Sequence, residues 1–444
     1  MNNKNKSNIF KNILNYLNTL PENRIILFIF IASILIAIIS GFKYYDRAPS
    51  GDATYYYNAA KIIKEKPIGW VSDKKIGVLE SLNAIIQGYL ILLPGDDFIN
   101  VYIFQILLYA ITSILIYLTS RHLLKPVPSL VVILFYLFNN KHWEGIYNFK
   151  PAVWVNLFLI FCIYESFQIV REPQKKYFIL LGISSGLLLL TDLRYIPHLF
   201  LIYFVLLFVK KGFCLNLKSI FMSILLAILI ITPWVIRQSI VFNKFVLVSD
   251  IHQISIEHIL NSSRIQELYE HKFLSNLSEE EFNNKFWEIC DSLDLSPGEL
   301  IYARNLNINR GTSLELKSNL LLIYLKRALF FWEPFRFSYE FDPYWQEAKI
   351  YPPAGLLSNI NRIVFFGSLL PFFIVGLILL WHRKILYAAI STGILFSHTI
   401  VHMLTYLQWR YMLPVLPLIT IIAIYGIVEI ITYSKKKITF INKK

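Results

Sequence analysis

The chain has 444 residues, of which 56% are hydrophobic and 16% are charged, and its mean hydropathy is +0.51. This composition excludes an ordinary soluble globular protein and indicates a polytopic membrane protein. The net charge of +14 does not point to a nucleic-acid partner, because the lysines and arginines cluster in short segments between apolar runs, as in cytoplasmic loops. The three cysteines are too widely spaced to indicate a zinc site or a disulfide framework.

The apolar runs, taken in chain order, predict about ten membrane-spanning helices. A helix needs roughly 20 apolar residues to cross the hydrocarbon core, or somewhat fewer with polar flanks. The first run is long enough to span and lacks a small-residue cleavage site, so we expect a retained helix and no cleavable signal peptide. The expected spans are 24–42, 98–120, 127–139, 151–169, 177–191, 195–209, 218–236, 360–381, 384–402 and 411–433.

The segment 79–93, "LESLNAIIQGYLILL", is apolar but carries Glu80, Asn83 and Gln87. These polar residues favour a juxtamembrane helix at the outer interface over a further crossing. This assignment fixes the side on which every later loop falls.

With that parity, the basic clusters all fall on one side of the membrane, which the positive-inside rule makes the cytoplasmic side. Both termini are then cytoplasmic. The clusters are the N-terminal "NNKNKSNIFK" and the segments 121–125, 171–176, 210–218, 382–384 and 435–437. The opposite side receives 43–97, 140–150, 192–194, 238–359 and the turn near 403–410.

The spans and loops divide the chain into three parts. Residues 1–237 form an N-terminal transmembrane module with the first outer loop (43–97), residues 238–359 an outer region, and residues 360–444 the C-terminal helices with a basic tail. The outer region contains charge-rich helical sequence such as "LSEEEFNNKFWEICDSL", and 320–334 predicts an interfacial helix. Neither a GxGxxG motif nor a P-loop occurs, and no clear internal repeat supports an inverted-repeat transporter.

Asp52 is the first candidate for chemistry. In "PSGDATYYYNAAKIIKE" it precedes a helical pattern from about Ala53 to Glu65, so one interpretation is a helix cap. The other is a carboxylate at the outer face that acts as general base toward an acceptor or binds a metal. Both interpretations can hold together, and Asp52→Asn separates them because asparagine caps a helix but cannot accept the proton.

Three arginines lie at outer ends of predicted spans: Arg237 in "TPWVIRQS", Arg194 in "TDLRYIP" and Arg410 in "QWRYMLP". Such arginines commonly extend to the membrane interface while their stems cover apolar surface. A guanidinium in this place can also hold a phosphate through two parallel hydrogen bonds. Both interpretations stay open for each of the three.

His398 and His402 have the i, i+4 spacing that can place two imidazoles on one helix face for a metal. No glutamate completes an HExxH arrangement, so packing inside the bundle is the simpler interpretation for His398, whereas His402 lies nearer the outer end. Lys150 and Glu144 flank another outer helix end, where solvated loop charges are the default.

Four stretches, in this order, carry a resemblance to a known family: "SGDATYYYNAAKII", "GLLLLTDLRYIPHLFLIY", "TPWVIRQSIVFNKFVLVS" and "HMLTYLQWRYMLPVLPLI". With them the chain resembles the GT-C superfamily of integral-membrane glycosyltransferases, in the protein-mannosyltransferase-like branch (glycosyltransferase family 39-like) that includes aminoarabinose transferases. The resemblance implies an all-α bundle with outer-face juxtamembrane helices and a helical outer loop region.

The resemblance also implies a function. Such enzymes transfer a sugar from a polyprenyl-phosphate carrier to a protein, lipid or glycan acceptor at the outer face of the prokaryotic cytoplasmic membrane, usually with inversion. Asp52 would be the catalytic residue, directly or through a divalent metal such as Mg or Mn. The expected donor-phosphate residues are Arg237 and Arg410, then Arg194 and Lys150, and the expected substrate-pocket residues are Tyr55, Tyr56, His402 and Tyr411.

The chain departs from the family pattern in ways that leave metal dependence open. Asp52 is followed by Ala53, where many relatives have a second acid, and Lys150 stands where relatives often carry an acid. Two other functions stay open as alternatives: a transporter or flippase of lipid-linked saccharides, and a polymerase or ligase of such saccharides. A transporter would be favoured by ionisable residues in mid-span, which the sequence largely lacks.

Overall fold

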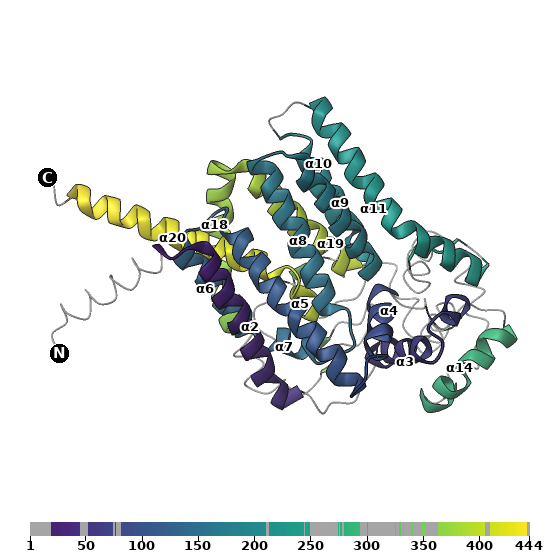
Figure 1. Ribbon diagram of the computed structural model, residues 1–444. Coiled ribbons are helices and arrows are strands. Elements are labelled where there is room, and N and C mark those ends of the chain that lie inside the picture. The colour runs from purple at the N-terminus through teal and green to yellow at the C-terminus, as the bar shows by residue number, and fades with distance from the viewer. Residues whose placement is uncertain are drawn as a thin grey trace.

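The computed structural model describes most of the helical chain. The described residues are 19–44, 52–73, 76, 81–209, 213–243, 245–248, 279–293, 363–404 and 409–441, with isolated positions between 274 and 350. Figure 1 shows the long helices side by side in one bundle. The described strands are β1 (Tyr339–Glu340) and β2 (Lys349–Ile350), a two-residue antiparallel pair.

Each expected span coincides with a helix, and this confirms an all-α polytopic membrane protein. Six of these helices are long and apolar enough to cross a membrane by themselves: α2, α5, α8, α11, α19 and α20. The helices are α2 (Glu22–Tyr44), α5 (Asp97–Ser120), α6 (Pro126–Leu137), α8 (Ala152–Arg171), α9 (Lys175–Thr191), α10 (Ile196–Leu206), α11 (Phe213–Phe242), α18 (Leu370–Arg383), α19 (Ile385–Leu404) and α20 (Leu416–Ile441). A π-helical turn, η5 (Ile363–Gly367), precedes α18.

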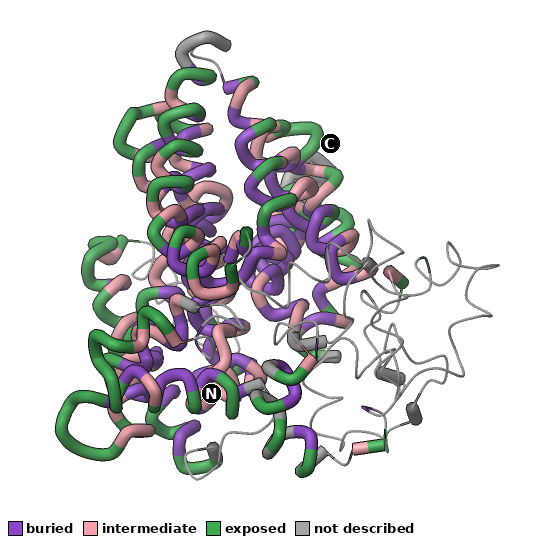
Figure 2. Tube along the Cα trace, turned by 90° about the vertical axis from the view of Figure 1, so that its right-hand side faces the viewer, coloured by how far each residue is buried: buried purple, intermediate pink, exposed green. Residues whose placement is uncertain are grey.

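Small residues allow the helices to approach closely. A Cβ added at Gly182 of α9 would lie 2.5 Å from the backbone oxygen of Ser223 in α11, so only glycine permits this contact. Figure 2 shows the buried residues, in purple, inside the bundle and the exposed residues, in green, on its outer surfaces. The outer surface of α11 carries large apolar side chains such as Phe221 and Leu229, as a lipid-facing helix requires.

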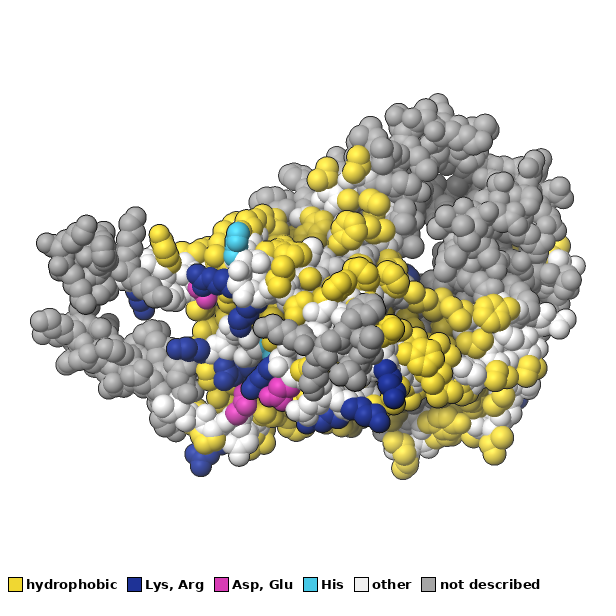
Figure 3. Space-filling model, turned by 90° about the horizontal axis from the view of Figure 1, so that it is seen from above, with side chains coloured by type: hydrophobic (Ala, Val, Ile, Leu, Met, Phe, Trp, Pro, Cys, Tyr) yellow, Lys and Arg dark blue, Asp and Glu magenta, His cyan; other side chains and the backbone are white. Residues whose placement is uncertain are grey.

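One end of the bundle, here called the basic end, gathers the loops that the charge pattern places together. Arg121 after α5 lies 3.3 Å from Glu22, which begins α2, and the Nζ of Lys384 donates to the backbone oxygen of His122 at 2.9 Å. The charge of Arg171, at the end of α8, also acts on His122. Dark-blue Lys and Arg side chains lie mostly in the left half of Figure 3. The clusters 121–125, 171–176 and 382–384 therefore share one end, as expected from the sequence.

The opposite end, here called the Asp52 end, carries the short helices between the spans. They are α3 (Asp52–Glu65), η1 (Gly69–Ser72), α4 (Ser81–Leu90), α7 (Asn140–Ile146), η2 (Leu193–Tyr195) and η6 (Trp409–Met412). In the outer region, α14 (Glu279–Leu293) covers the charge-rich segment expected to be helical. The expectation for 320–334 falls almost entirely outside the described residues.

Candidate functional site

Helix α3 presents its first residue, Asp52, at the Asp52 end of the bundle. The side chain of Asp52 lies outside the described residues. The helix buries one stripe, which consists of Ala53, Tyr56, Ala60 and Ile63, against α4. A Cβ added at Gly88 of α4 would lie 2.6 Å from the Cβ of Ile63, so the Ile63 side chain packs directly on the backbone of α4 at this point. Packing therefore fixes where α3 begins.

Two further contacts hold α3 to the start of α5. The Nζ of Lys64 lies 2.6 Å from Oδ1 of Asp97, and the ring of Tyr57 stacks on Phe98 at 5.2 Å between centroids. Of the two tyrosines expected in the substrate pocket, Tyr56 is 4% exposed and belongs to the core, whereas Tyr55 is 40% exposed. The side chain of Tyr55 is thus the accessible one of the two, and its expected substrate role stays a prediction.

The polar residues of α4 are buried rather than facing an interface. Asn83 and Gln87 are both fully buried, and their amide nitrogens donate to the backbone oxygen of Phe149 at 2.6 and 3.3 Å. Gln105 of α5 donates to the backbone oxygen of Asn148 at 2.9 Å. These carboxamides hold the turn that carries Lys150 just before α8. Sequence reasoning missed this role, although two carboxamides spaced i, i+4 in an apolar helix were its signal.

Arg237 of α11 is 7% exposed and is hydrogen-bonded to the first outer loop. Its guanidinium donates to four backbone oxygens of that loop, in Trp70, Val71, Asp73 and Ile76, and to the Oε1 of the adjacent Gln238. A guanidinium has five N–H donors, and these five bonds engage all of its nitrogens. Arg237 therefore fixes the position of η1 and the segment that follows it.

Neighbours of Arg237 extend this connection to the outer region. Trp234 lies 5.0 Å from the Arg237 guanidinium and donates from Nε1 to the backbone oxygen of Val248 at 2.7 Å. Gln238 donates to the same oxygen at 3.1 Å. The end of α11 thus joins the first outer loop to the start of the region 238–359. The phosphate-binding role expected for Arg237 stays a prediction.

Arg194 lies in η2, at the junction of α9 and α10, and is held by a carboxylate. Asp192, 3% exposed, accepts from Nε of Arg194 at 2.9 Å and from Nη2 at 2.7 Å, and it also accepts from the backbone N–H of Arg194 at 3.0 Å. This bidentate pair fixes the plane of the guanidinium. The central carbon of the guanidinium lies 4.6 Å from the ring centroid of Tyr411 in η6.

Tyr411 connects Arg194 to the histidines of α19. The ring of His402 stacks on Tyr411 at 4.6 Å with an interplanar angle of 11°, and Nε2 of His398 bonds to the backbone oxygen of Tyr411. Nδ1 of His398 lies 3.0 Å from Nε2 of His198 in α10. A neutral His398 therefore donates from Nε2 and accepts at Nδ1. Two of the four stretches that carry the family resemblance meet in this cluster.

The remaining expected site residues are placed only in part. Arg410 belongs to η6, beside Tyr411, but its side chain lies outside the described residues. His398 and His402 meet edge to face at 4.5 Å between centroids. No group of three His, Cys, Asp or Glu side chains suited to a metal occurs among the described residues. The described residues therefore offer no donor set for the expected divalent metal.

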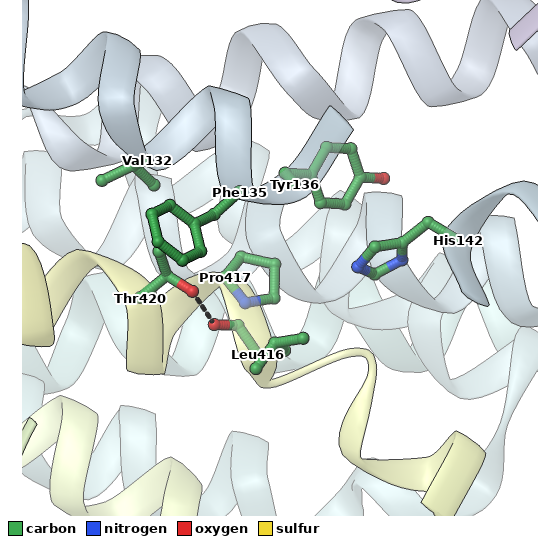
Figure 4. Close-up of a pocket in the computed structure, with 7 residues that line it drawn as sticks. All are labelled: Val132, Phe135, Tyr136, His142, Leu416, Pro417 and Thr420. Atoms are coloured by element: carbon green, nitrogen blue, oxygen red, sulfur yellow. Dashed lines mark hydrogen bonds between the residues drawn. The ribbon is translucent and has the colours of Figure 1, made fainter. Parts of the chain in front are cut away.

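A small pocket lies between α6, α7 and the start of α20, and its lining residues are labelled in Figure 4. The wall is apolar except for His142, Tyr136 and Thr420, and the Thr420 hydroxyl donates to the backbone oxygen of Leu416. Burial lowers the pKa of His142 to about 3, so its imidazole is neutral, and Nδ1 lies 3.4 Å from the amide nitrogen of Asn156. None of the expected site residues lines this pocket.

Comparison with known proteins finds a family match for part of the chain. Residues 82–236 match the model of the family described as dolichyl-phosphate-mannose-protein mannosyltransferase. The matched segment runs from α4 into α11 and contains Lys150 and Arg194, whereas Asp52, Arg237 and Arg410 lie outside it. No curated protein sequence matches the chain.

Solved structures share the fold at low sequence identity. The oligosaccharyltransferase AglB of the archaeon Archaeoglobus fulgidus, in complex with an inhibitory peptide and a dolichol-phosphate, matches with a TM-score of 0.55 and 11% identity over 95% of this chain and 52% of that one. The same archaeal enzyme in its apo form matches with a TM-score of 0.54 and 12% identity, over 94% of this chain and 52% of that one. A third structure, in complex with Zn and sulfate, gives 0.53 and 12%, over 94% and 50%.

The chain spans about half the length of these solved structures. The resemblance to GT-C membrane glycosyltransferases is confirmed by the family match of 82–236 and by the fold shared with AglB. The chain is a multi-pass membrane protein that shares its fold with AglB.

Proposed function

We propose that this protein is a membrane glycosyltransferase that transfers a sugar from a polyprenyl-phosphate donor to an acceptor at the outer face of the cytoplasmic membrane. One observation carries the proposal: α3 begins at Asp52 at the same end of the bundle where Asp192 and Tyr411 hold Arg194. A carboxylate and an oriented guanidinium are the two groups that this transfer needs. The dolichol-phosphate in the AglB complex supports a lipid phosphate as carrier.

The proposed reaction assigns one role to each group. The acceptor oxygen attacks the anomeric carbon as Asp52 accepts its proton, and the bond from that carbon to the phosphate oxygen breaks on the opposite side, which inverts the configuration. The electron pair leaves with polyprenyl phosphate. Arg194 and Arg410 offset the charge that develops on the leaving phosphate. Lys150 adds a positive charge near the same end, Tyr55 and Tyr411 line the sugar path, and the buried His402 stacks on Tyr411.

Asp52→Asn tests the proposal directly. Membranes that contain the full chain are incubated with labelled polyprenyl-phosphate sugars and a panel of protein, lipid and glycan acceptors. We expect Asp52→Asn to abolish transfer while the helix content and melting temperature stay unchanged, because asparagine caps a helix as well as aspartate. Transfer by the variant at the wild-type rate would contradict the role of Asp52.

Asp96→Asn is the matched control. Asp96 caps α5 by accepting from the backbone N–H groups of Phe98 and Ile99 at 2.8 and 3.0 Å, at the same end of the bundle. The same chemical change at this carboxylate should leave transfer intact. Chelation by EDTA, followed by addition of Mg²⁺ or Mn²⁺, reports metal dependence in the same assay. Movement of the lipid-linked sugar without a new glycosidic bond would instead support a flippase.

The proposed orientation places both termini and the basic end in the cytoplasm. The positive-inside rule supports this orientation, since Arg121, Arg171 and Lys384 share the basic end. Single cysteines introduced at exposed positions of the two ends and labelled with an impermeant maleimide in intact cells test it. Labelling at the basic end and none at the Asp52 end would overturn the proposal.

A further inference from the structure

Basic and aromatic side chains surround His122 at the basic end and are here called the His122 cluster. Arg121 follows α5, Arg171 ends α8, and Lys384 separates α18 from α19, so three different loops bring their cations together. The Nζ of Lys384 donates to the backbone oxygen of His122 at 2.9 Å. Burial, and then the charges of Arg171 and Lys384, lower the pKa of His122 to about 4. Arg171 and Lys384 therefore both lie close enough to His122 for their charges to act on its imidazole.

The positive charge of Lys384 is not matched by a nearby carboxylate. Glutamates at this end pair with the arginines: Arg121 with Glu22 at 3.3 Å, Arg171 with Glu172 at 4.0 Å, and Arg383 with Glu429. Among the described side chains, no carboxylate lies within 4 Å of Lys384, and Glu429 acts on it only from farther away. Its half-buried ammonium donates to a neutral carbonyl, which offsets only part of the cost of burying a charge.

Aromatic rings pack around the imidazole of His122 in the same cluster. The imidazole of His122 lies 5.8 to 6.1 Å, between centroids, from Tyr164, Phe167 and Tyr387, and the Nζ of Lys384 lies 5.6 Å from the Tyr387 centroid. Aromatic rings beside basic side chains are typical of the depth at which lipid headgroups lie. Nδ1 of His122 is buried and has no hydrogen-bond partner among the described residues. The His122 cluster thus combines cations with aromatic rings in the pattern that is typical of the headgroup level.

We propose that the His122 cluster binds the phosphate headgroup of an anionic phospholipid, with Lys384 and Arg171 as its charged contacts. Basic pockets between transmembrane helices on the cytoplasmic side recognise such headgroups, and each Lys or Arg near the surface contributes about 1 kcal/mol. The site lies at the end opposite Asp52 and is independent of the proposed transfer reaction. Its ligand is a structural lipid, and the acyl chains lie along the apolar outer surface of the bundle.

Native mass spectrometry of the delipidated full chain tests the site. Phosphatidylglycerol and phosphatidylcholine with identical acyl chains are titrated separately, and the dissociation constant of the first bound lipid is measured. We expect phosphatidylglycerol to bind more tightly, and Lys384→Gln and Arg171→Gln each to weaken it about fivefold, the factor that corresponds to 1 kcal/mol. Equal binding of the two lipids, or unchanged binding by both variants, would overturn the proposal.

Two controls separate charge from folding and lipid from soluble phosphate. Lys384→Arg keeps the charge and should keep the affinity, whereas loss equal to that of Lys384→Gln would contradict an electrostatic site. Lys141→Gln removes a charge at the Asp52 end, where Lys141 pairs with Glu144 at 2.8 Å, and should change nothing. Displacement of phosphatidylglycerol by an equal concentration of glycerol 3-phosphate would show a soluble phosphate ester as the ligand and would overturn the lipid assignment.

Discussion

Arg237 and Arg194 lie at the same end of the bundle, and each is close to an aromatic ring, but their hydrogen-bond partners differ. Arg237 is directed at four backbone oxygens of the first outer loop and at a neighbouring amide. Arg194 is bound by one carboxylate, which holds the guanidinium plane against Tyr411. The first arrangement connects segments of the chain, and the second orients a cationic group.

This difference predicts separate roles for Arg237 and Arg194. Backbone oxygens are neutral, and Arg237 exchanges its hydration for bonds to four of them; two of these, in Trp70 and Asp73, also accept from a backbone N–H. Arg194 has its charge partly offset by Asp192, and the pair holds the guanidinium in one orientation, as a group that contacts the phosphate of the bound donor requires. We therefore expect substitutions of Arg237 to act on stability and those of Arg194 to act on donor binding.

Arg237→Ala should have the largest effect. The substitution removes five hydrogen bonds and takes away the side-chain donor to the backbone oxygens of Val71 and Ile76, so we expect a loss of about 3–5 kcal/mol in the free energy of unfolding. Hydrogen exchange of the segment 66–76 should become much faster than in the wild type. Unfolding in detergent and exchange followed by mass spectrometry measure both effects.

Arg237→Lys sharpens the distinction between a clamp and a phosphate ligand. Lysine keeps the charge but has three donors on one nitrogen and cannot reach four separate oxygens. Exchange of 66–76 should therefore stay fast in this variant. Exchange and stability like the wild type, together with a raised KM for the donor, would contradict the clamp and support phosphate binding.

Much of the fold was predictable because lipid imposes strong rules. Each transmembrane helix needs an apolar run, so ten expected spans match ten helices, and charge alone placed the clusters around Arg121, Arg171 and Lys384 together. The inward-facing role of Asn83 and Gln87 was not predictable in the same way. Polarity shows that a residue avoids lipid, but not whether it faces water or a backbone oxygen inside the protein.

The candidate site was predictable only as residue types at one end. The pattern of an arginine at the outer end of a span is the same for Arg237 and Arg194, because their partners come from segments far away in the sequence. Asp192 was not singled out, although it directly precedes η2 and is two residues from Arg194. An acid two residues before an arginine at a helix end was the signal for that pair.

Arg194→Ala should have the next largest effect, on donor binding. A charged hydrogen bond to phosphate contributes about 1.5–3 kcal/mol, so the KM for a polyprenyl-phosphate sugar should rise roughly tenfold to a hundredfold. Stability should fall as well, because the buried carboxylate of Asp192 loses its charged partner. Steady-state kinetics with varied donor gives KM and kcat separately. An unchanged KM would remove Arg194 from the donor site.

Asp192→Asn should have a smaller effect through the orientation of Arg194. Asparagine retains an oxygen that can accept from the backbone N–H of Arg194, so η2 should persist. The bidentate charged contact is lost, and the guanidinium becomes free to rotate. We expect the KM for the donor to rise about threefold to tenfold with unchanged helix content. If Asp192→Asn also changed KM in an Arg194→Ala background, Asp192 would act on the donor by another route.

Substitution of Tyr411 should have the smallest effect and shows whether its ring or its hydroxyl matters. The ring lies between His402, stacked at 4.6 Å, and the guanidinium of Arg194, also at 4.6 Å. Tyr411→Phe keeps both contacts and should bind donor like the wild type. Tyr411→Leu loses the ring, and each stacking or cation contact contributes about 0.5–1 kcal/mol, so KM should rise roughly twofold to fivefold. A loss in Tyr411→Phe as large as that in Tyr411→Leu would assign the role to the hydroxyl, because both variants lack the oxygen and only Tyr411→Phe keeps the ring.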